Sequence, residues 1–113
     1  MNQENKTIKI CVAANDKDVN AEIDARFGRC GYFVFFTIQD KKIINTEIAR
    51  NSGASQGGGA GIRAAEQLGE ARADILIAER IGPKAENILE QLNIKIVKKA
   101  GIVKAVVEEY IKE

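Results

Sequence analysis

The second half of the chain alternates between helix-forming and strand-forming segments, and this alternation restricts the possible folds more than any other feature. Residues 73–78 contain Ile75-Leu76-Ile77 and form a short continuous apolar run, which is typical of a buried parallel strand. Apolar residues with helical spacing come before this run, after it, and again at the end of the chain. Parallel strands joined by helices require right-handed crossovers. The sequence therefore predicts an α/β domain with a mostly parallel sheet.

Three strands are expected before the first helix, beginning with Ile8–Ala14. The second, Tyr32–Gln39, is rich in β-branched and aromatic residues. Residues 42–49 are its expected hairpin partner across a polar turn at Asp40-Lys41. The later elements are a helix from about Gly58, the strand 73–78, a helix from Pro83 to about Asn93, a strand 94–97, and a final helix marked by Val103, Val106, Val107 and Tyr110.

A chain of 113 residues, of which 45% are hydrophobic, suits one compact domain, and we expect it over residues 8–113. Residues 1–7 are polar and mixed in charge, so a flexible N-terminus is expected rather than a secretory signal. No apolar run reaches the roughly 18 residues of a membrane helix. A net charge of +1 gives no general attraction to nucleic acid. We therefore expect a cytoplasmic monomer that binds neither nucleic acid nor membrane.

The sequence contains no histidine and only two cysteines, Cys11 and Cys30. Catalytic triads that use histidine are therefore impossible, and Ser52 and Ser55 lie in no nucleophile elbow. Two cysteines are too few for a disulfide scaffold, and without carboxylates they cannot complete a closed zinc site. These observations indicate a protein that is not an enzyme.

Three loops are expected to meet at one edge of the sheet, beyond the carboxyl ends of the parallel strands. They comprise residues 15–31, 50–61 and 79–82. Open α/β sheets usually bind ligands at this edge. Two helices are expected to begin there, near Gly58 and Pro83, and helix N-termini favour anions. The topology thus predicts a site for a negatively charged ligand.

A short segment between the first two expected strands holds the sharpest candidates for this site. Arg26 and Arg29 supply forked donors for an anion, and Gly28 lets the backbone approach a ligand closely. Among these positive charges, Cys30 is expected to be a more acidic thiol and a metal ligand. The alternative is that Cys30 is a small buried residue at the start of the next strand. Cys11 is expected to pack in the core.

Glycines and further arginines map to the same edge. The run Gly57-Gly58-Gly59-Ala60-Gly61 is similar to an anion cradle, although it lacks the Lys-Ser/Thr ending of a P-loop. A flexible loop that packs closely on the sheet would explain it equally well. Arg50 and Arg80 are expected near Arg26 and Arg29. The first loop also carries carboxylates whose spacing does not match an EF-hand, so we expect them to be solvated. They are Asp16, Asp18, Glu22 and Asp24.

The string Arg26-Phe27-Gly28-Arg29-Cys30-Gly31-Tyr32-Phe33 resembles the x-F-G-R-x-x-Y-F signature of the dinitrogenase iron–molybdenum cofactor biosynthesis family, which includes NifX-type proteins. Gly58–61 with the following Ala65-Glu66-Gln67-Leu68 is similar to the family's glycine-rich loop and helix. Ile81-Gly82-Pro83-Lys84-Ala85 resembles its I-G-P-N-A turn. The resemblance covers about residues 8–112. It implies a three-layer α/β/α, ribonuclease-H-like sandwich with a five-stranded mixed sheet whose second strand is antiparallel.

The resemblance also implies a function, which is to bind or carry an anionic iron–sulfur or iron–molybdenum cluster in nitrogenase cofactor assembly or a related pathway. A cluster donor or acceptor protein would be the partner. Family members often carry histidine directly before Phe-Gly, where this chain has Arg26, so direct metal ligation would depend on Cys30. The implied cluster-binding residues are Arg26, Phe27, Gly28, Arg29, Cys30, Gly57, Gly58, Gly59, Arg80 and Gly82.

Two alternatives remain on the same fold. A small-anion or nucleotide-phosphate binding regulatory module would use the same arginines and glycines without a thiol ligand. A ribonuclease-H-type nuclease would need clustered carboxylates on the strands for two metal ions, and the expected strands carry almost none.

Overall fold

The computed structural model describes residues 6–55 and 57–113. The flexible N-terminus expected at residues 1–7 therefore lies mainly outside the described residues. The elements follow the expected order. They are β1 (Ile8–Ala14), β2 (Tyr32–Gln39), β3 (Lys42–Arg50), α1 (Ala60–Glu70), β4 (Ile75–Ala78), α2 (Pro83–Gln91), β5 (Lys95–Lys98) and α3 (Val103–Ile111).

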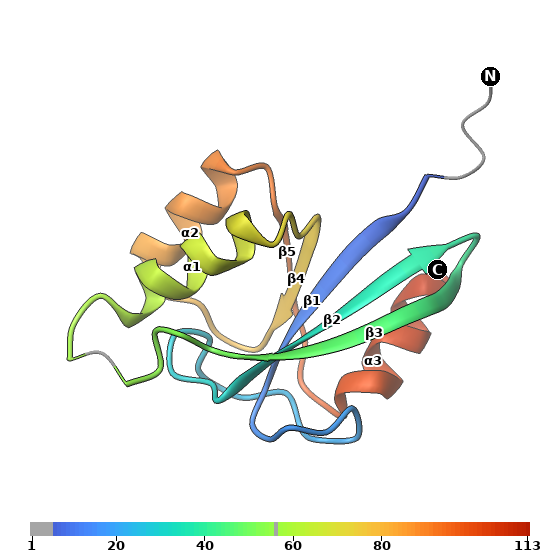
Figure 1. Ribbon diagram of the computed structural model, residues 1–113, viewed down its shortest axis with the longest axis horizontal. Coiled ribbons are helices and arrows are strands. Elements are labelled where there is room, and N and C mark those ends of the chain that lie inside the picture. Colours follow the sequence, from blue (N-terminus) through green and yellow to red (C-terminus); the bar gives the residue numbers. More distant parts are fainter. Residues whose placement is uncertain (1–5, 56) are drawn as a thin grey trace.

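The five strands form one mixed sheet with the order β3-β2-β1-β4-β5. β2 runs antiparallel to both of its neighbours, whereas β4 is parallel to β1 and to β5. Figure 1 shows α1 and α2 on one side of this sheet and α3 on the other. This arrangement confirms the predicted three-layer α/β/α fold with an antiparallel second strand. No helix in the described part of the chain is long and apolar enough to cross a membrane.

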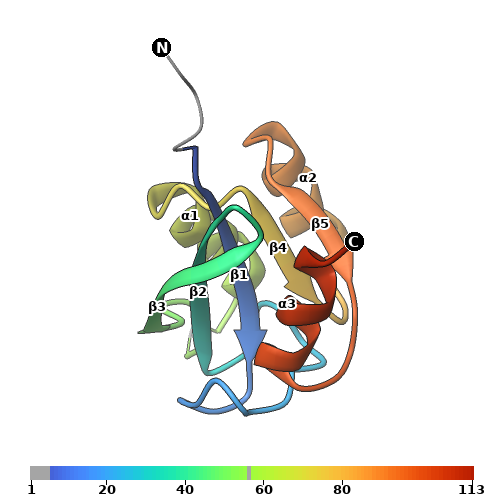
Figure 2. The same ribbon diagram turned by 90° about the vertical axis from the view of Figure 1, so that its right-hand side faces the viewer.

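Side chains of the central strand β1 alternate between two hydrophobic cores, as a period of two residues requires. Cys11 and Ala13 belong to the core formed with α1 and α2. Ile10 and Val12 belong to the core formed with α3. Two helices cover the first face and one helix the second, an asymmetry that is visible in Figure 2. On the second face, towards β3, Ile43 is only half-buried.

The β2–β3 hairpin turns through two residues, Asp40 and Lys41, as their polar character predicts. Both have positive φ angles, 54° and 62°. This is the type I′ geometry, whose twist matches that of the flanking strands. β3 ends at Arg50, one residue later than expected.

Two strand boundaries differ from the expected ones for a common reason. The N–H of Ala73 donates to the carbonyl of Leu68 at 3.1 Å, so residue 73 closes the C-terminal end of α1 and β4 starts two residues later. The N–H of Ile94 likewise donates to the carbonyl of Leu89 at 2.9 Å, which delays β5 by one residue. In both places, an apolar residue that was expected to begin a strand uses its N–H group to close the preceding helix.

Candidate functional site

Several backbone hydrogen bonds fasten the long loop 15–31 to the rest of the fold, and two of its contacts bear on the site. Ile23 is buried, pairs with Ala14 in an isolated bridge, and donates its N–H to the carbonyl of Gly101 at 2.8 Å. Further along, the N–H of Phe27 donates to the carbonyl of Arg80 at 3.2 Å. The second bond brings the Arg26–Cys30 segment against the turn that precedes α2, as the predicted topology requires.

Gly28 packs backbone to backbone against the first turn of α1. A Cβ atom at Gly28 would lie 2.8 Å from both Cα and N of Gly61. Gly61 in turn faces α2, because a Cβ built there would lie 3.4 Å from Cβ of Ala85. Only glycine permits the first of these approaches. The contact therefore explains why a glycine follows Phe27.

A cavity of about 360 Å³ lies where these segments meet, and we refer to it as the edge cavity. Its lining comes from three parts of the chain, and the residues are Phe27, Gly28, Gly59, Ala60, Gly61, Ile62, Gly82, Pro83, Lys84 and Ala85. A Cβ atom on any of the four glycines that precede α1 and α2 would meet nothing within 4 Å. These glycines are Gly57, Gly58, Gly59 and Gly82. Bare backbone thus borders open space at this site.

Both helices that begin at the edge cavity lack a side-chain cap. Gly59 precedes α1 with a left-handed φ of 76°, so the helix starts at Ala60 rather than near the expected Gly58. Gly82 precedes α2 in an extended conformation. The first N–H groups of a helix have no intrahelical acceptor, and they carry the positive end of the helix dipole. Two such ends at one cavity favour an anion.

Arg26 and Arg80 lie together beside the edge cavity. They line an adjoining hollow of about 310 Å³ that shares Phe27, Gly28 and Gly82 with it. The Arg26 side chain is 70% exposed, and its Nε lies 3.8 Å from a carboxylate oxygen of Asp24. The Asp24 carboxylate is only 13% exposed, but a contact this long to a largely exposed guanidinium is weak. Arg26 therefore remains available to an incoming anion.

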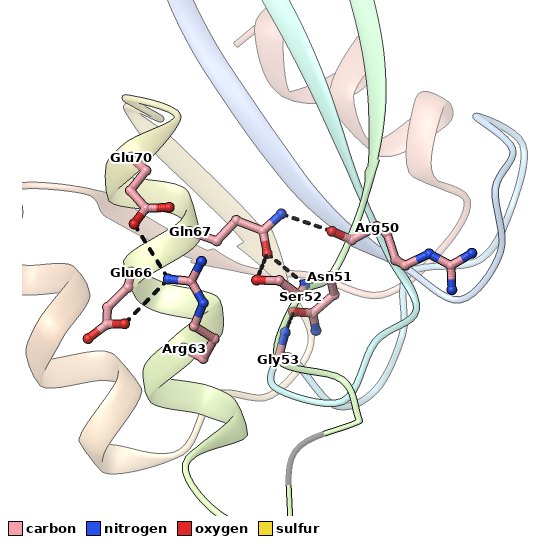
Figure 3. Close-up of polar contacts among 8 residues, drawn as sticks. All are labelled: Arg50, Asn51, Ser52, Gly53, Arg63, Glu66, Gln67 and Glu70. Atoms are coloured by element: carbon pink, nitrogen blue, oxygen red, sulfur yellow. Dashed lines mark hydrogen bonds and ion pairs between the residues drawn. The ribbon is translucent and has the colours of Figure 1, made fainter.

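The other two arginines have different surroundings. Arg29 donates from Nη1 to the carbonyl of Ala54 at 3.2 Å and from Nη2 to that of Gly57 at 3.1 Å. It therefore ties the glycine-rich loop to the first loop. The guanidinium of Arg50 lies 5.9 Å from the centre of the Tyr32 ring. In Figure 3 the Arg50 side chain points away from α1.

Cys30 is completely buried and packs in the core on the α1 and α2 side. Burial raises the pKa of its thiol from 9.0 to about 12, and the negative charge of Asp24 acts in the same direction. The expectation of a more acidic thiol is therefore wrong, because the head group of Arg29 binds carbonyls in the next loop instead. The pKa of the buried Cys11 thiol is also raised, mainly by burial. Cys30 does not line the edge cavity.

Within residues 6–55 and 57–113, no group of three or more cysteine, aspartate or glutamate side chains is placed to hold a metal ion. In the first loop, carboxylate oxygens of Asp16, Asp18 and Asp24 instead accept nearby backbone N–H groups at 2.7–2.9 Å. These local bonds shape the loop. These carboxylates are therefore engaged in shaping the loop and do not line the edge cavity.

Asn51 joins the two loops at the site, and the sequence analysis did not single it out. It is the buried polar residue of the described chain, at 2% exposure. Its Nδ2 donates to the carbonyls of Gly28 and Cys30, at 3.1 and 2.9 Å, and lies 3.7 Å from Sγ of Cys30. Its Oδ1 accepts the N–H of Gly53 at 2.9 Å. No sequence pattern marks this role, since asparagine is ordinary in a Ser/Gly loop.

Gln67 holds the same loop from the side of α1, as Figure 3 shows. Its Nε2 donates to the carbonyl of Arg50 at 2.9 Å. Its Oε1 accepts both the N–H and the hydroxyl of Ser52, at 2.9 and 3.0 Å. The end of β3 is thus fixed against the helix before the glycine run begins.

Fold and site together define a class, which is a small α/β/α domain with an anion-compatible cavity at the carboxyl edge of a mixed five-stranded sheet. Residues 8–113 match the protein family described as dinitrogenase iron-molybdenum cofactor. The chain belongs to this family, in agreement with the resemblance carried by its three motifs.

The chain is also similar to individual known proteins. The uncharacterized protein MJ0580 of Methanocaldococcus jannaschii is 32% identical over 79 residues, which are 70% of this chain and 67% of that protein. The crystal structure of PH0822 superimposes with a TM-score of 0.82 at 22% identity, covering 93% of this chain and 91% of that one, and supports the fold. The apo form of the orange protein from Desulfovibrio gigas has a TM-score of 0.81 at 28% identity, covering 92% and 87% of the two chains.

Proposed function

We propose that this protein binds and carries a preassembled anionic metal cluster of the iron–sulfur or iron–molybdenum type, without catalysing a reaction. The observation that carries this proposal is the edge cavity, at which α1 and α2 both begin without a side-chain cap. Bare N–H donors and two positive helix ends suit the sulfide and thiolate surface of such clusters. Membership of the family supports the same class of cargo.

In this proposal the cluster arrives with its own ligands. The described chain lacks a group of three metal-binding side chains. A thiolate is the form of cysteine that binds metals, and Cys30 is buried with a raised pKa. Cys30 would become a ligand only if the first loop moved away from Asn51. A donor protein would deliver the cluster and an acceptor would receive it, with the carrier acting as a cytoplasmic monomer.

The residues have distinct roles in the proposed site. Backbone N–H groups at the starts of α1 and α2 contact the cluster, and Arg26 and Arg80 balance its charge from the adjoining hollow. Arg29 and Asn51 are positioning residues, because they bind loop carbonyls rather than line the cavity. The remaining wall and backbone residues are Phe27, Gly28, Gly57, Gly58, Gly59 and Gly82.

A second candidate function is a module that binds a small oxyanion or a nucleotide phosphate and regulates a partner. The buried, weakly acidic thiol favours it, because such a ligand needs no thiolate. It would use the same helix ends and arginines. The two candidates differ in the ligand, so the experiment must offer both.

Gly82 supplies a matched pair of variants for this experiment. Its φ is −71° and its ψ is 160°, and a Cβ atom there would meet nothing within 4 Å, so side chains fit without strain. Asparagine and aspartate are both good helix N-caps. They differ in charge alone, and the charge of aspartate lies at the mouth of the edge cavity.

The anaerobic protein is mixed with a synthetic thiolate-ligated [4Fe–4S] cluster and desalted, and iron content and visible absorption are measured. We expect the wild type to retain the cluster and Gly82→Asn to bind it somewhat more weakly, because its amide caps one N–H of α2. Gly82→Asp should bind about tenfold more weakly than Gly82→Asn, since one unfavourable charge contact of about 1.4 kcal/mol has that effect. Cys30→Ser should not change retention. Equal retention by both Gly82 variants would refute binding at this cavity. Saturable binding of inorganic phosphate alone, lost in Gly82→Asp, would support the second function.

A further inference from the structure

The sheet face that carries α3 is hollowed on its β3 side. A cavity of about 600 Å³ lies between the β2–β3 hairpin and α3, and we refer to it as the hairpin cavity. Figure 1 shows α3 alongside this hairpin, away from α1 and α2. Its apolar lining consists of buried Phe36 with half-buried Val19, Ile43 and Ile111. The volume lies within the range of small-molecule sites, and four of the ten lining residues are apolar.

Four lysines belong to the lining of the hairpin cavity. Lys41 and Lys42 come from the hairpin, and Lys104 and Lys112 come from α3 and its end. None of them makes an ion pair within the described residues. Glu108 is the single carboxylate of the lining. Since the whole chain carries only +1, this excess of positive charge is local.

The backbone holds both walls of the hairpin cavity in place. The type I′ turn at Asp40 and Lys41 leaves the lysines at the hairpin end little freedom of backbone position. On the other wall, the N–H of Lys104 donates to the carbonyl of Val19 at 2.9 Å. The start of α3 is therefore tied to the loop that lines the same cavity. The lysines of the hairpin cavity are thus attached to backbone segments whose positions are fixed.

We infer that the hairpin cavity binds a small organic anion that has an apolar ring or chain. The apolar part packs on Phe36, Ile43 and Ile111, and the anionic group lies among the lysines. An ammonium is a compact point charge without a fixed planar fork. A carboxylate, a sulfonate and a phosphate monoester therefore all suit the site, provided that an apolar body accompanies them. This site shares no lining residue with the edge cavity.

The aromatic sulfonate 1-anilinonaphthalene-8-sulfonate is a suitable probe, because it combines an apolar ring system with one anionic group. We expect saturable binding to one site, with enhanced probe fluorescence. Amide chemical shifts of the isotope-labelled protein should change around the hairpin cavity. The amides expected to shift are those of Val19, Ile43, Thr46, Lys104 and Glu108.

A matched pair of double variants tests the role of charge. Lys42→Glu with Lys104→Glu reverses two charges at the rim and should weaken probe binding by about tenfold or more, since such a loss corresponds to a single charge-assisted contact. Lys17→Glu with Lys98→Glu makes the same change of net charge at exposed residues that line neither cavity. This control should bind the probe within about twofold of wild type. All four lysines are exposed, so circular dichroism should show both variants folded.

Four outcomes would overturn the inference. One is equal weakening of probe binding in the two double variants, which would indicate a general effect of net charge. The second is a set of amide shifts centred on the starts of α1 and α2. The third is that inorganic phosphate alone produces the same shifts as the probe, because the site would then need no apolar body. The fourth is the absence of saturable probe binding, which is expected if the lysines of the hairpin cavity bind only an acidic protein segment.

Discussion

The edge cavity and the hairpin cavity differ in the part of the chain that lines them. Four of the ten residues around the edge cavity are glycines, and backbone N–H groups at the starts of two helices border it, with Lys84 as its one charged lining residue. Around the hairpin cavity, four of the ten residues are lysines and none is a glycine. Backbone N–H groups can move only if the helices that contain them move. Lysine side chains can rotate while their backbone stays in place. Side-chain atoms added where the backbone is closely packed, as at Gly28, should therefore disturb the first site, whereas added negative charge should weaken binding at either site.

The largest effect is expected where the edge cavity depends on a bare backbone contact. Gly28→Ala would place Cβ 2.8 Å from the backbone of Gly61, so we expect the free energy of unfolding to fall by about 3 kcal/mol, the upper end for overpacking. Urea unfolding measures this loss. Gly58→Ala is the control, since its Cβ would meet nothing within 4 Å and stability should change by less than about 0.5 kcal/mol. Equal stabilities of the two variants would contradict the close approach.

The next effect concerns the amide that joins the two loops. Asn51→Ala leaves the carbonyls of Gly28 and Cys30 without this donor, and we expect a loss of about 2 kcal/mol. Asn45→Ala, at an exposed position of β3, should cost much less. Amide hydrogen exchange would distinguish the two sites. Protection should fall around the edge cavity in Asn51→Ala and stay unchanged around the hairpin cavity.

A pH effect should be confined to the side of the sheet that contains the thiols. The folded-state pKa of Cys30 is raised from 9.0 to about 12, so the unfolded chain loses this proton first as the pH rises. The contribution of this thiol to the free energy of unfolding is fully present below pH 9. It is lost between pH 9 and 12, by up to about 1.4 kcal/mol per pH unit. Urea midpoints of wild type and Cys30→Ala across this range measure the difference. A slope that is identical in the two proteins would exclude the thiol as its source.

The smallest effect is expected at Gly82, where stability and binding should change in opposite directions. Gly82→Asp adds a capping side chain and a negative charge at the start of α2, which stabilises a helix by a few tenths of a kcal/mol. Thermal unfolding in low salt measures this gain. The same variant should lose the anion of the edge cavity and keep the aromatic sulfonate of the hairpin cavity. Loss of both ligands would show that the two cavities are not independent.

Local patterns were enough to predict the sheet. The alternation of Ile10 and Val12 with Cys11 and Ala13 depends only on the two-residue period of a strand, and the structure assigns these pairs to opposite cores. The Asp40-Lys41 turn and the helix start at Pro83 are equally local signals. Strand boundaries were less accurate, because Ala73 and Ile94 use their N–H groups to close the preceding helices.

The site could be predicted only in outline. Topology correctly brought the three loop segments to one edge, but the direction of each side chain depends on contacts that are distant in sequence. Arg29 lies next to Cys30 in the chain, yet its guanidinium binds carbonyls of the following loop, while the thiol of Cys30 is buried in the core. The roles of Asn51 and Gln67 likewise depend on carbonyls that only the folded chain brings within reach.

The three segments around the edge cavity, residues 27–28, 59–62 and 82–85, come together only in the complete fold. An unfolded copy has no such site, so occupancy and folding are thermodynamically linked. A ligand at about one hundred times its dissociation constant would add roughly 2.7 kcal/mol to the free energy of unfolding. A loaded molecule would therefore resist proteolysis longer than an empty one, and a copy that begins to unfold would release what it holds.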